Sequence, residues 1–334
     1  MSNRIRSAAT LFALGATLSL TVSAAGPGRL DAHSTVETGL TANGARTTPG
    51  PGDSTQTAAS AFARFADALR GLSGSLFARF VSPSTKTAAV PAFAALFGDS
   101  SLSRPGMYPI APLARPFAFI TMHPFAEKHG MKLGSYRLGF WPAEKHAVKS
   151  PAYANPNGFI EVTPANMDTP VSEHFKLGDF LTHDQADVWP KYLVLNDKLI
   201  DKLELVWQEL QREGVPVKHM SVMSGFRTPW YNANGGSTAG RAAESRHMYG
   251  DASDVFVDND GLGRMSDLNH DGRVDWRDSR MIARAADRVG EEHPELVGGT
   301  GVYSGNRSHG PFTHIDVRGS AAHWGVGMRT GAGE

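Results

Sequence analysis

The stretch Ser245-Arg246-His247-Met248-Tyr249-Gly250-Asp251-Ala252-Ser253-Asp254 decides how this chain is interpreted. It places the imidazole of His247 and the carboxylate of Asp254 seven positions apart, with small residues between them. A turn at Gly250 followed by a short strand over residues 252–257 brings both side chains toward one ion. Zinc binds histidine nitrogen and aspartate oxygen at about 2.0–2.2 Å, and a catalytic zinc keeps three protein ligands and one open position. The stretch therefore predicts two ligands of a metal site.

A third ligand is expected further along the chain, in Phe312-Thr313-His314-Ile315-Asp316-Val317-Arg318-Gly319. His314 is the preferred donor in this stretch, because an imidazole is a better zinc ligand than a carboxylate at a strand position. Together with His247 and Asp254 it makes a set of two imidazoles and one carboxylate. Such a set leaves one corner of a tetrahedral zinc site vacant.

Periodic patterns around these motifs predict an α+β fold. A helix is expected from its N-cap Asn196 to Gly214, because apolar residues recur along one face of it. A second helix is expected from about Trp276 to Val289. The expected strands are residues 217–224, 252–257, 301–303 and 312–317. These elements predict a central, mostly antiparallel sheet with flanking helices, in a domain over residues 166–330.

The chain before this domain divides into four expected parts. Residues 1–25 have the positive start, the apolar run and the small-residue end of an export signal. Residues 26–56 are rich in Gly, Pro, Thr and Ser, which predicts a disordered linker. Residues 57–105 carry apolar residues at helical spacing and are expected to form a helical arm. Residues 106–165 contain short strand-like pieces between Pro and Gly residues, which predicts a small β-rich module.

Composition narrows the function classes. Lys+Arg and Asp+Glu number 33 each in 334 residues, so no strong field attracts nucleic acid or an anionic membrane. Cysteine is absent, so the chain is expected to hold together without disulfides. No segment carries the roughly twenty apolar residues that would predict an integral membrane span. With the export signal, these features predict a protein of the bacterial periplasm or exterior, whose oligomeric state the sequence leaves open.

The chain resembles the zinc D-Ala-D-Ala carboxypeptidase and murein endopeptidase family in three consecutive motifs. They are Ser224-Gly225-Phe226-Arg227-Thr228-Pro229, the Ser-x-His-x-x-Gly-x-Ala-x-Asp pattern that ends at Asp254, and Thr313-His314-Ile315-Asp316-Val317-Arg318-Gly319. That family belongs to the LAS-type metallopeptidases, named for lysostaphin, D-Ala-D-Ala metallopeptidase and sonic hedgehog. The resemblance covers about residues 171–325 and implies the hedgehog and D-Ala-D-Ala-peptidase type of core.

The resemblance also implies roles for single residues. His247, Asp254 and His314 match the zinc ligands, and Arg227 matches a catalytic arginine that grips a terminal carboxylate or a developing oxyanion. The implied reaction is hydrolysis of a peptide bond in a peptidoglycan stem peptide or cross-link by a metal-activated water. It would make the protein a carboxypeptidase or an endopeptidase.

The general base stays open in this comparison. Some relatives place a glutamate three residues before the last histidine ligand, where this chain has Pro311. Others use a His-x-His pair, and the corresponding residues here are His314 and Asp316. Asp316 is then either the base, or the ligand with His314 as the base. His309, just upstream, is a second candidate base.

A calcium loop is expected within an insertion at residues 258–280. The stretch Asp267–Asp278 resembles a loop of the EF-hand or dockerin type, with Gly272 at its sixth position. The expected calcium ligands are Asp267, Asn269, Asp271, the carbonyl of Arg273, Asp275 and Asp278. Asp278 stands where such loops usually carry a glutamate, and no clear helix precedes the loop. The competing interpretation is an Asp- and Asn-rich turn that holds no ion.

These features favour an exported zinc metallopeptidase that acts on peptidoglycan peptides, with calcium bracing an inserted loop. The missing glutamate keeps open an alternative, a non-catalytic, zinc-stabilised and calcium-braced cell-wall binding module. A calcium-dependent adhesion or scaffold module is a third class. The sequence does not specify whether the bond is D,D or L,D, or whether it is terminal or in a cross-link.

Overall fold

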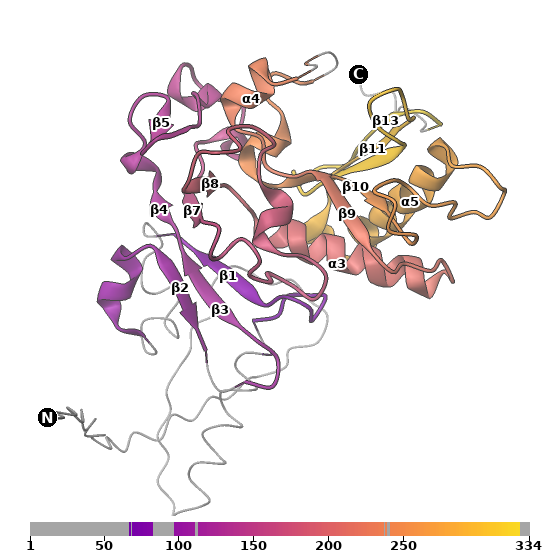
Figure 1. Ribbon diagram of the computed structural model, residues 1–334, viewed down its shortest axis with the longest axis horizontal. Coiled ribbons are helices and arrows are strands. Elements are labelled where there is room, and N and C mark those ends of the chain that lie inside the picture. The colour runs from indigo at the N-terminus through magenta and orange to yellow at the C-terminus, as the bar shows by residue number, and fades with distance from the viewer. Residues whose placement is uncertain are drawn as a thin grey trace, which may run out of the picture. The chain divides into compact units, whose positions relative to one another are not determined.

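The computed structural model describes residue 67 and residues 69–82, 97–110, 113–236, 238 and 241–327. The expected signal peptide at residues 1–25 and the expected linker at residues 26–56 lie outside the described residues, as does part of the expected arm. The described part is an α+β fold with several mostly antiparallel sheets and three α-helices (Figure 1).

The largest sheet has five strands in the order β13-β11-β12-β10-β9. Their bounds are β9 Met220–Ser224, β10 Ala252–Val257, β11 Gly299–Tyr303, β12 Phe312–Asp316 and β13 Ala322–Gly325. All neighbours in this sheet run antiparallel except β11 and β13, which run parallel. The structure confirms the central, mostly antiparallel sheet, with the strand over residues 252–257 at its predicted bounds.

The described helices are α3 (Asp197–Arg212), α4 (Pro229–Asn234) and α5 (Trp276–Glu292). Asn196 caps α3 as predicted, because its side chain accepts a hydrogen bond from Lys198 N at 3.0 Å. The apolar faces of α3 and α5 are buried against each other, and α5 also packs on β11 and β12 (Figure 1). Among the residues that the structure describes, no helix has the length and apolar character to span a membrane.

Helix α5 packs against β11 and β12 on one face of the five-stranded sheet, and the candidate site lies on the other face. Thr313 Oγ1 donates to Ser279 O of α5 at 2.7 Å, so Thr313 faces the helix. Side chains alternate along a strand, so Phe312 and His314 face the opposite side of the sheet.

Smaller sheets precede the large one in the chain. Their strands are β1 Ala78–Val81, β2 Gly106–Pro109, β3 Ala118–Thr121, β4 His123–Pro124, β5 Lys132–Leu133, β6 Tyr136–Arg137, β7 Gly158–Val162 and β8 Lys191–Leu193. They form three sheets, ordered β1-β3-β2, β4-β7-β8 and β5-β6. Residues 106–162 thus contain short strands as expected, and the main apolar core joins them to the helices and the large sheet, beside a second, smaller cluster of Val81, Ile110, Phe117 and Phe119.

The helical arm expected over residues 57–105 is wrong at Ala78–Val81, because these residues form the strand β1. The backbone of this segment finds partners in distant parts of the chain. Phe77 N donates to Val171 O at 2.8 Å, and β1 then pairs in parallel with β3. Gly71 and Gly74 have φ angles of 75° and 68°, a left-handed conformation that ends any helix before the strand begins.

The β-rich segment also supports the 3₁₀ helix Arg246–Tyr249, which carries His247. Trp141 Nε1 donates to Met248 O at 2.8 Å, and Arg246 Nη1 donates to Ala152 O at 2.8 Å. The Trp141 side chain is fully buried, so the first of these bonds is shielded from water. Residues far upstream in the chain therefore hold the 3₁₀ helix in place.

Gly250 links this helix to β10, and we expect Gly250→Ala to destabilise the fold by about 3 kcal/mol or more. Its φ is 67°, and an added Cβ would lie 2.2 Å from Val194 O. Gly214→Ala is the matched control, since Gly214 has a φ of 78° and nothing within 4 Å of its Cβ position. The control should lose only about 1–2 kcal/mol, the cost of the left-handed backbone. Urea unfolding measures both, and equal losses would contradict the expected clash.

Candidate metal centre

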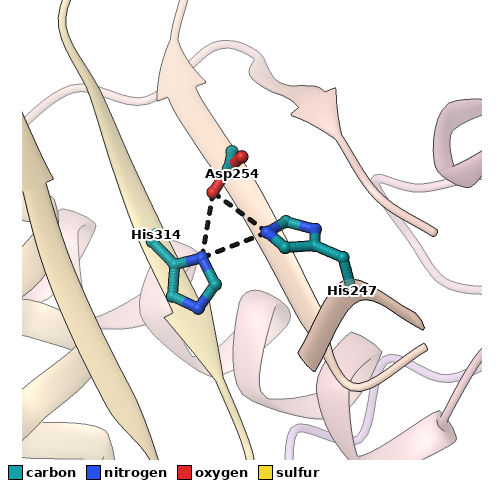
Figure 2. Close-up of side chains that lie close together, drawn as sticks. All are labelled: His247, Asp254 and His314. Carbon is teal, nitrogen blue, oxygen red and sulfur yellow. Dashed lines mark hydrogen bonds and ion pairs between the residues drawn. The ribbon is translucent and has the colours of Figure 1, made fainter. Parts of the chain in front are cut away.

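Three buried side chains converge on the face of the sheet opposite α5. His247 Nε2 lies 3.2 Å from His314 Nδ1, and Asp254 Oδ1 lies 3.3 Å from the former and 3.0 Å from the latter. Figure 2 shows the three side chains turned toward one another. Their exposed fractions are 2%, 4% and 7% for His247, Asp254 and His314. Among the described residues this is the one group of three or more His, Cys, Asp or Glu side chains that could hold a metal ion.

Local structure explains why these residues meet. The antiparallel register of β10 and β12 pairs Asp254 directly with His314, so both side chains leave the same face of the sheet. His247 comes from the 3₁₀ helix that ends at Gly250, whose φ of 67° turns the chain into β10. The seven-residue spacing thus spans a turn and the first part of a strand, as the sequence predicts.

Gly225 holds His247 in the tautomer that a metal requires. His247 Nδ1 donates to Gly225 O at 2.7 Å, which leaves Nε2 unprotonated and facing Asp254 and His314. Burial lowers the pKa of His247, and this effect outweighs the opposing attraction of Asp254. The neutral imidazole is the form that binds metal ions, so the site favours the form it needs.

Asp316 orients the second imidazole. His314 Nε2 donates to Asp316 Oδ2 at 3.1 Å, while Nδ1 faces Asp254 and His247. Burial acts to lower the pKa of His314, but the hydrogen bonds to Asp254 and Asp316 outweigh it and raise the pKa. A carboxylate behind a histidine ligand is a common support of metal sites, because it directs the other ring nitrogen toward the ion.

Asp316 is itself fully buried, and both of its carboxylate oxygens accept hydrogen bonds. Oδ1 accepts from Gly299 N at 2.7 Å and from Arg318 N at 3.1 Å, and Arg318 Nε and Nη2 bind the carboxylate as well. Burial would raise the pKa of Asp316, but the bonds from His314 and Arg318 lower it well below its usual range. Asp316 therefore lies behind His314, which favours His314 over Asp316 as the ligand.

Arg227 lies beside the candidate ligands. Its Nε donates to Ser224 Oγ at 2.8 Å, and its Nη2 forms an ion pair with Asp254 Oδ2. Burial would raise the pKa of Asp254, but His247, His314 and Arg227 together hold it well below its usual value. In this structure the arginine thus stabilises the charged form of the candidate ligand Asp254.

The second candidate base, His309, contacts its own loop. Its Nδ1 lies 2.8 Å from Gly310 O and its Nε2 lies 2.7 Å from Asn306 Nδ2. Its ring packs edge-on against Phe312, with ring centroids 5.0 Å apart. Within the described part of the chain, no hydrogen bond or ion pair joins His309 to the three candidate ligands.

In the expected calcium loop, side-chain oxygens accept hydrogen bonds from backbone N–H groups of the same loop. Asp267 Oδ2 accepts from Gly272 N at 2.8 Å, and Asn269 Oδ1 accepts from Asp271 N at 2.9 Å. Of the other expected ligands, Asp275 caps α5, Asp278 accepts from Leu268 N and Asp275 N, and Arg273 N donates to Asp271. In the described residues the loop carboxylates do not form a group as tight as the metal centre. Calcium binding by this loop stays a prediction.

The sequence alone assigns no role to three residues that contact the candidate ligands or their partners, namely Gly225, Arg318 and Trp324. Gly225 contributes only a carbonyl, and Arg318 acts through Asp316. Trp324 lies with its ring centroid 5.0 Å from that of His314. Arg318 belongs to the motif Thr313–Gly319, so its place in that motif could have indicated a role at the site. No motif includes Trp324.

Comparison of the chain with protein-family models, with curated proteins and with solved structures found no match. The structure itself shows a buried group of two imidazoles and one carboxylate that could hold a metal ion.

Proposed function

We propose that this protein is an exported bacterial zinc metallopeptidase that hydrolyses peptide bonds in peptidoglycan stem peptides or cross-links. The observation that carries this proposal is the convergence of His247, Asp254 and His314, whose facing atoms lie 3.0–3.3 Å apart. A tetrahedral ion with zinc's ligand distances would hold its ligand atoms about 3.3–3.6 Å apart. The observed separations come close to that spacing.

The donor set favours zinc over the other common metals. Two imidazoles and one carboxylate suit zinc, whereas calcium and magnesium are usually bound by oxygen ligands alone. Three protein ligands also leave a fourth position open, which is the pattern of catalytic zinc sites. When bound, zinc would lower the pKa of a water and polarise a substrate carbonyl.

The chain's own residues would prepare this chemistry. Gly225 O and Asp316 hold the two imidazoles with the correct nitrogen facing inward. Arg227 brings a positive charge to the edge of the site, where it can attract the terminal carboxylate of a peptide or the oxygen that becomes negative during attack. The negative carboxylate of Asp254, which pairs with Arg227, would also offset part of the positive charge that the metal and the arginine bring to the site.

The substrate class comes from the sequence. The order of the three motifs resembles that of wall peptidases, and the expected export signal would carry the enzyme to the compartment that contains peptidoglycan. The balanced charge of the chain also gives no reason to favour a polyanionic substrate.

One observation favours a second candidate, a zinc-stabilised and calcium-braced module that binds the cell wall without cutting it. Both oxygens of Asp316 are engaged by Gly299, His314 and Arg318. Both ring nitrogens of His309 contact its own loop. Neither candidate base thus presents a free acid–base atom to the metal centre.

Product analysis separates the two candidates. We expect the purified protein to release an amino acid or a cut cross-link from defined muropeptides, detected by mass spectrometry. A chelator should abolish the reaction, and added zinc should restore it, because the ligand set cannot activate water without the ion. Chelated protein refilled with calcium alone is the control. Binding to insoluble wall without any product, in the presence of zinc, would contradict the peptidase and support the binding module.

A further inference from the structure

A row of paired residues crosses the large sheet through the metal centre. Register pairs Ser224 with Asp254, Asp254 with His314, His314 with Gly301, and Gly301 with Trp324. Directly paired residues share a face of the sheet, so Trp324 lies on the same face as the candidate ligands. The row places Arg227 and Ser224 on the β9 side of the metal centre and Trp324 beyond its β11 side.

The absence of a side chain at Gly301 lets Trp324 reach the site. A Cβ on Gly301 would lie 2.5 Å from Trp324 Nε1, so the indole occupies the space that a side chain would fill. From there its ring approaches the ring of His314, with centroids 5.0 Å apart. Trp324 therefore spans Gly301 to form a wall beside the second imidazole.

Tyr303 completes this wall. It lies two residues after Gly301 on β11, pairs with Phe312, and stacks on the Phe312 ring with centroids 4.5 Å apart and an angle of 8° between the planes. Trp324 Nε1 donates to the Tyr303 hydroxyl oxygen at 2.8 Å. In that bond the Tyr303 oxygen is the acceptor, so the hydrogen of its hydroxyl remains able to donate. Within the described residues, no acceptor binds this hydrogen.

Trp324 places the Tyr303 hydroxyl near the site, because its ring centroid lies 5.0 Å from that of His314 and its Nε1 donates to that hydroxyl. Burial raises the pKa of Tyr303, and the carboxylate of Asp254 and the guanidinium of Arg227 are both close enough to act on it, in opposite directions. The phenol therefore keeps its proton at neutral pH and remains a hydrogen-bond donor.

We propose that Tyr303 is a catalytic residue that donates a hydrogen bond to the carbonyl oxygen of the scissile amide, and that Trp324 is the positioning residue that aims it. This role rests on the proposed peptidase function. When a hydroxide, formed from a water that has released one proton to solvent, bonds through its oxygen to the carbonyl carbon, the electron pair of the C=O π bond moves onto the carbonyl oxygen. Tyr303 stabilises that oxygen through its O–H and keeps its own proton, so no atom is transferred from the tyrosine.

The position of Tyr303 complements that of Arg227. Arg227 shares its positive charge with Asp254 on the β9 side, whereas Tyr303 offers a neutral donor with no acceptor among the described residues on the β11 side. A substrate between them would meet one donor on each side of the metal centre. A donor that strengthens its bond as negative charge develops lowers the barrier without tightening the binding of the ground state.

The test measures binding of a transition-state mimic as well as turnover. The probe is a phosphinate pseudodipeptide, in which a tetrahedral, negatively charged phosphinate replaces the scissile amide, and calorimetry gives its Kd for the zinc-loaded protein. Tyr303→Phe keeps the ring on Phe312 and removes only the hydroxyl. We expect it to weaken phosphinate binding at least about 10-fold and to lower kcat about 100-fold, with KM changed less than about 3-fold.

Tyr192→Phe is the matched control, because Tyr192 lies on β8 in another sheet and its hydroxyl contacts Glu161 at 3.4 Å. It should change neither Kd nor kcat. Trp324→Phe should give an intermediate loss, and combining it with Tyr303→Phe should add little, since both act through one hydrogen bond. Additive losses would overturn the positioning role of Trp324.

Two results overturn different claims. Equal phosphinate affinity and equal kcat for the wild type and Tyr303→Phe, at equal zinc content and melting temperature, would overturn the role of Tyr303 alone. A wild-type protein that holds zinc yet neither binds the phosphinate nor cuts muropeptides would overturn the peptidase proposal, and the role of Tyr303 with it.

Discussion

Asp254→Ala is expected to abolish zinc binding and peptide hydrolysis together. The substitution removes one of three ligands and leaves two imidazoles, which cannot hold the ion as a catalytic site does. It also leaves Arg227 beside the site without its partner carboxylate. We expect kcat/KM to fall by more than about 1000-fold and zinc content to fall below one ion per ten chains. Elemental analysis of dialysed protein and turnover of muropeptides measure the two effects.

Asp251→Ala is the matched control for this loss. Asp251 is also buried, and it pairs with the buried Arg246 just before β10. Its removal breaks a similar ion pair without touching the candidate ligands. The control should lower stability and leave zinc content and kcat of the folded protein unchanged. Full zinc content and activity in Asp254→Ala would refute the assignment of the metal centre.

Asp316→Ala should weaken zinc binding and the fold at the same time. Without the carboxylate, His314 Nε2, Gly299 N and Arg318 lose a buried acceptor. Breaking such a buried pair on one side costs about 3 kcal/mol in the free energy of unfolding, because a charge and several N–H groups are left unpaired. Loss of the carboxylate behind a histidine ligand typically costs 10–100-fold in metal affinity. Urea unfolding of the metal-free protein and competition with a chromophoric chelator give the two numbers.

The double variant Asp316→Ala with Arg318→Met distinguishes the two contributions. It removes the unpaired guanidinium, so part of the stability should return while the zinc affinity stays low. If Asp316→Ala held zinc as tightly as the wild type, Asp316 would have no part in orienting His314. Zinc affinity that recovered in the double variant would have the same meaning, since the loss would then stem from Arg318.

The helices α3 and α5 and the strand β10 could be predicted because their information is local. Asn196 and Asp275 cap the two helices through bonds to residues only two positions away. The convergence of the three candidate ligands could also be predicted, since His247 and Asp254 are joined by a short turn and His314 stands in a strand of clear pattern. Local hydrogen bonds and strand alternation suffice for these features.

Other features depend on partners far away in the sequence. The strand β1 replaces the expected helical arm because Val171 and β3 supply its backbone partners, and no local pattern reveals them. Strand register decides that Asp316 lies behind His314 and that Trp324 reaches across Gly301 to Tyr303. Residue types and their spacing thus suffice to name the candidate metal ligands. The residues that support these ligands, and the Tyr303 hydroxyl beside them, follow from the pairing of strands, which is a long-range property of the folded chain.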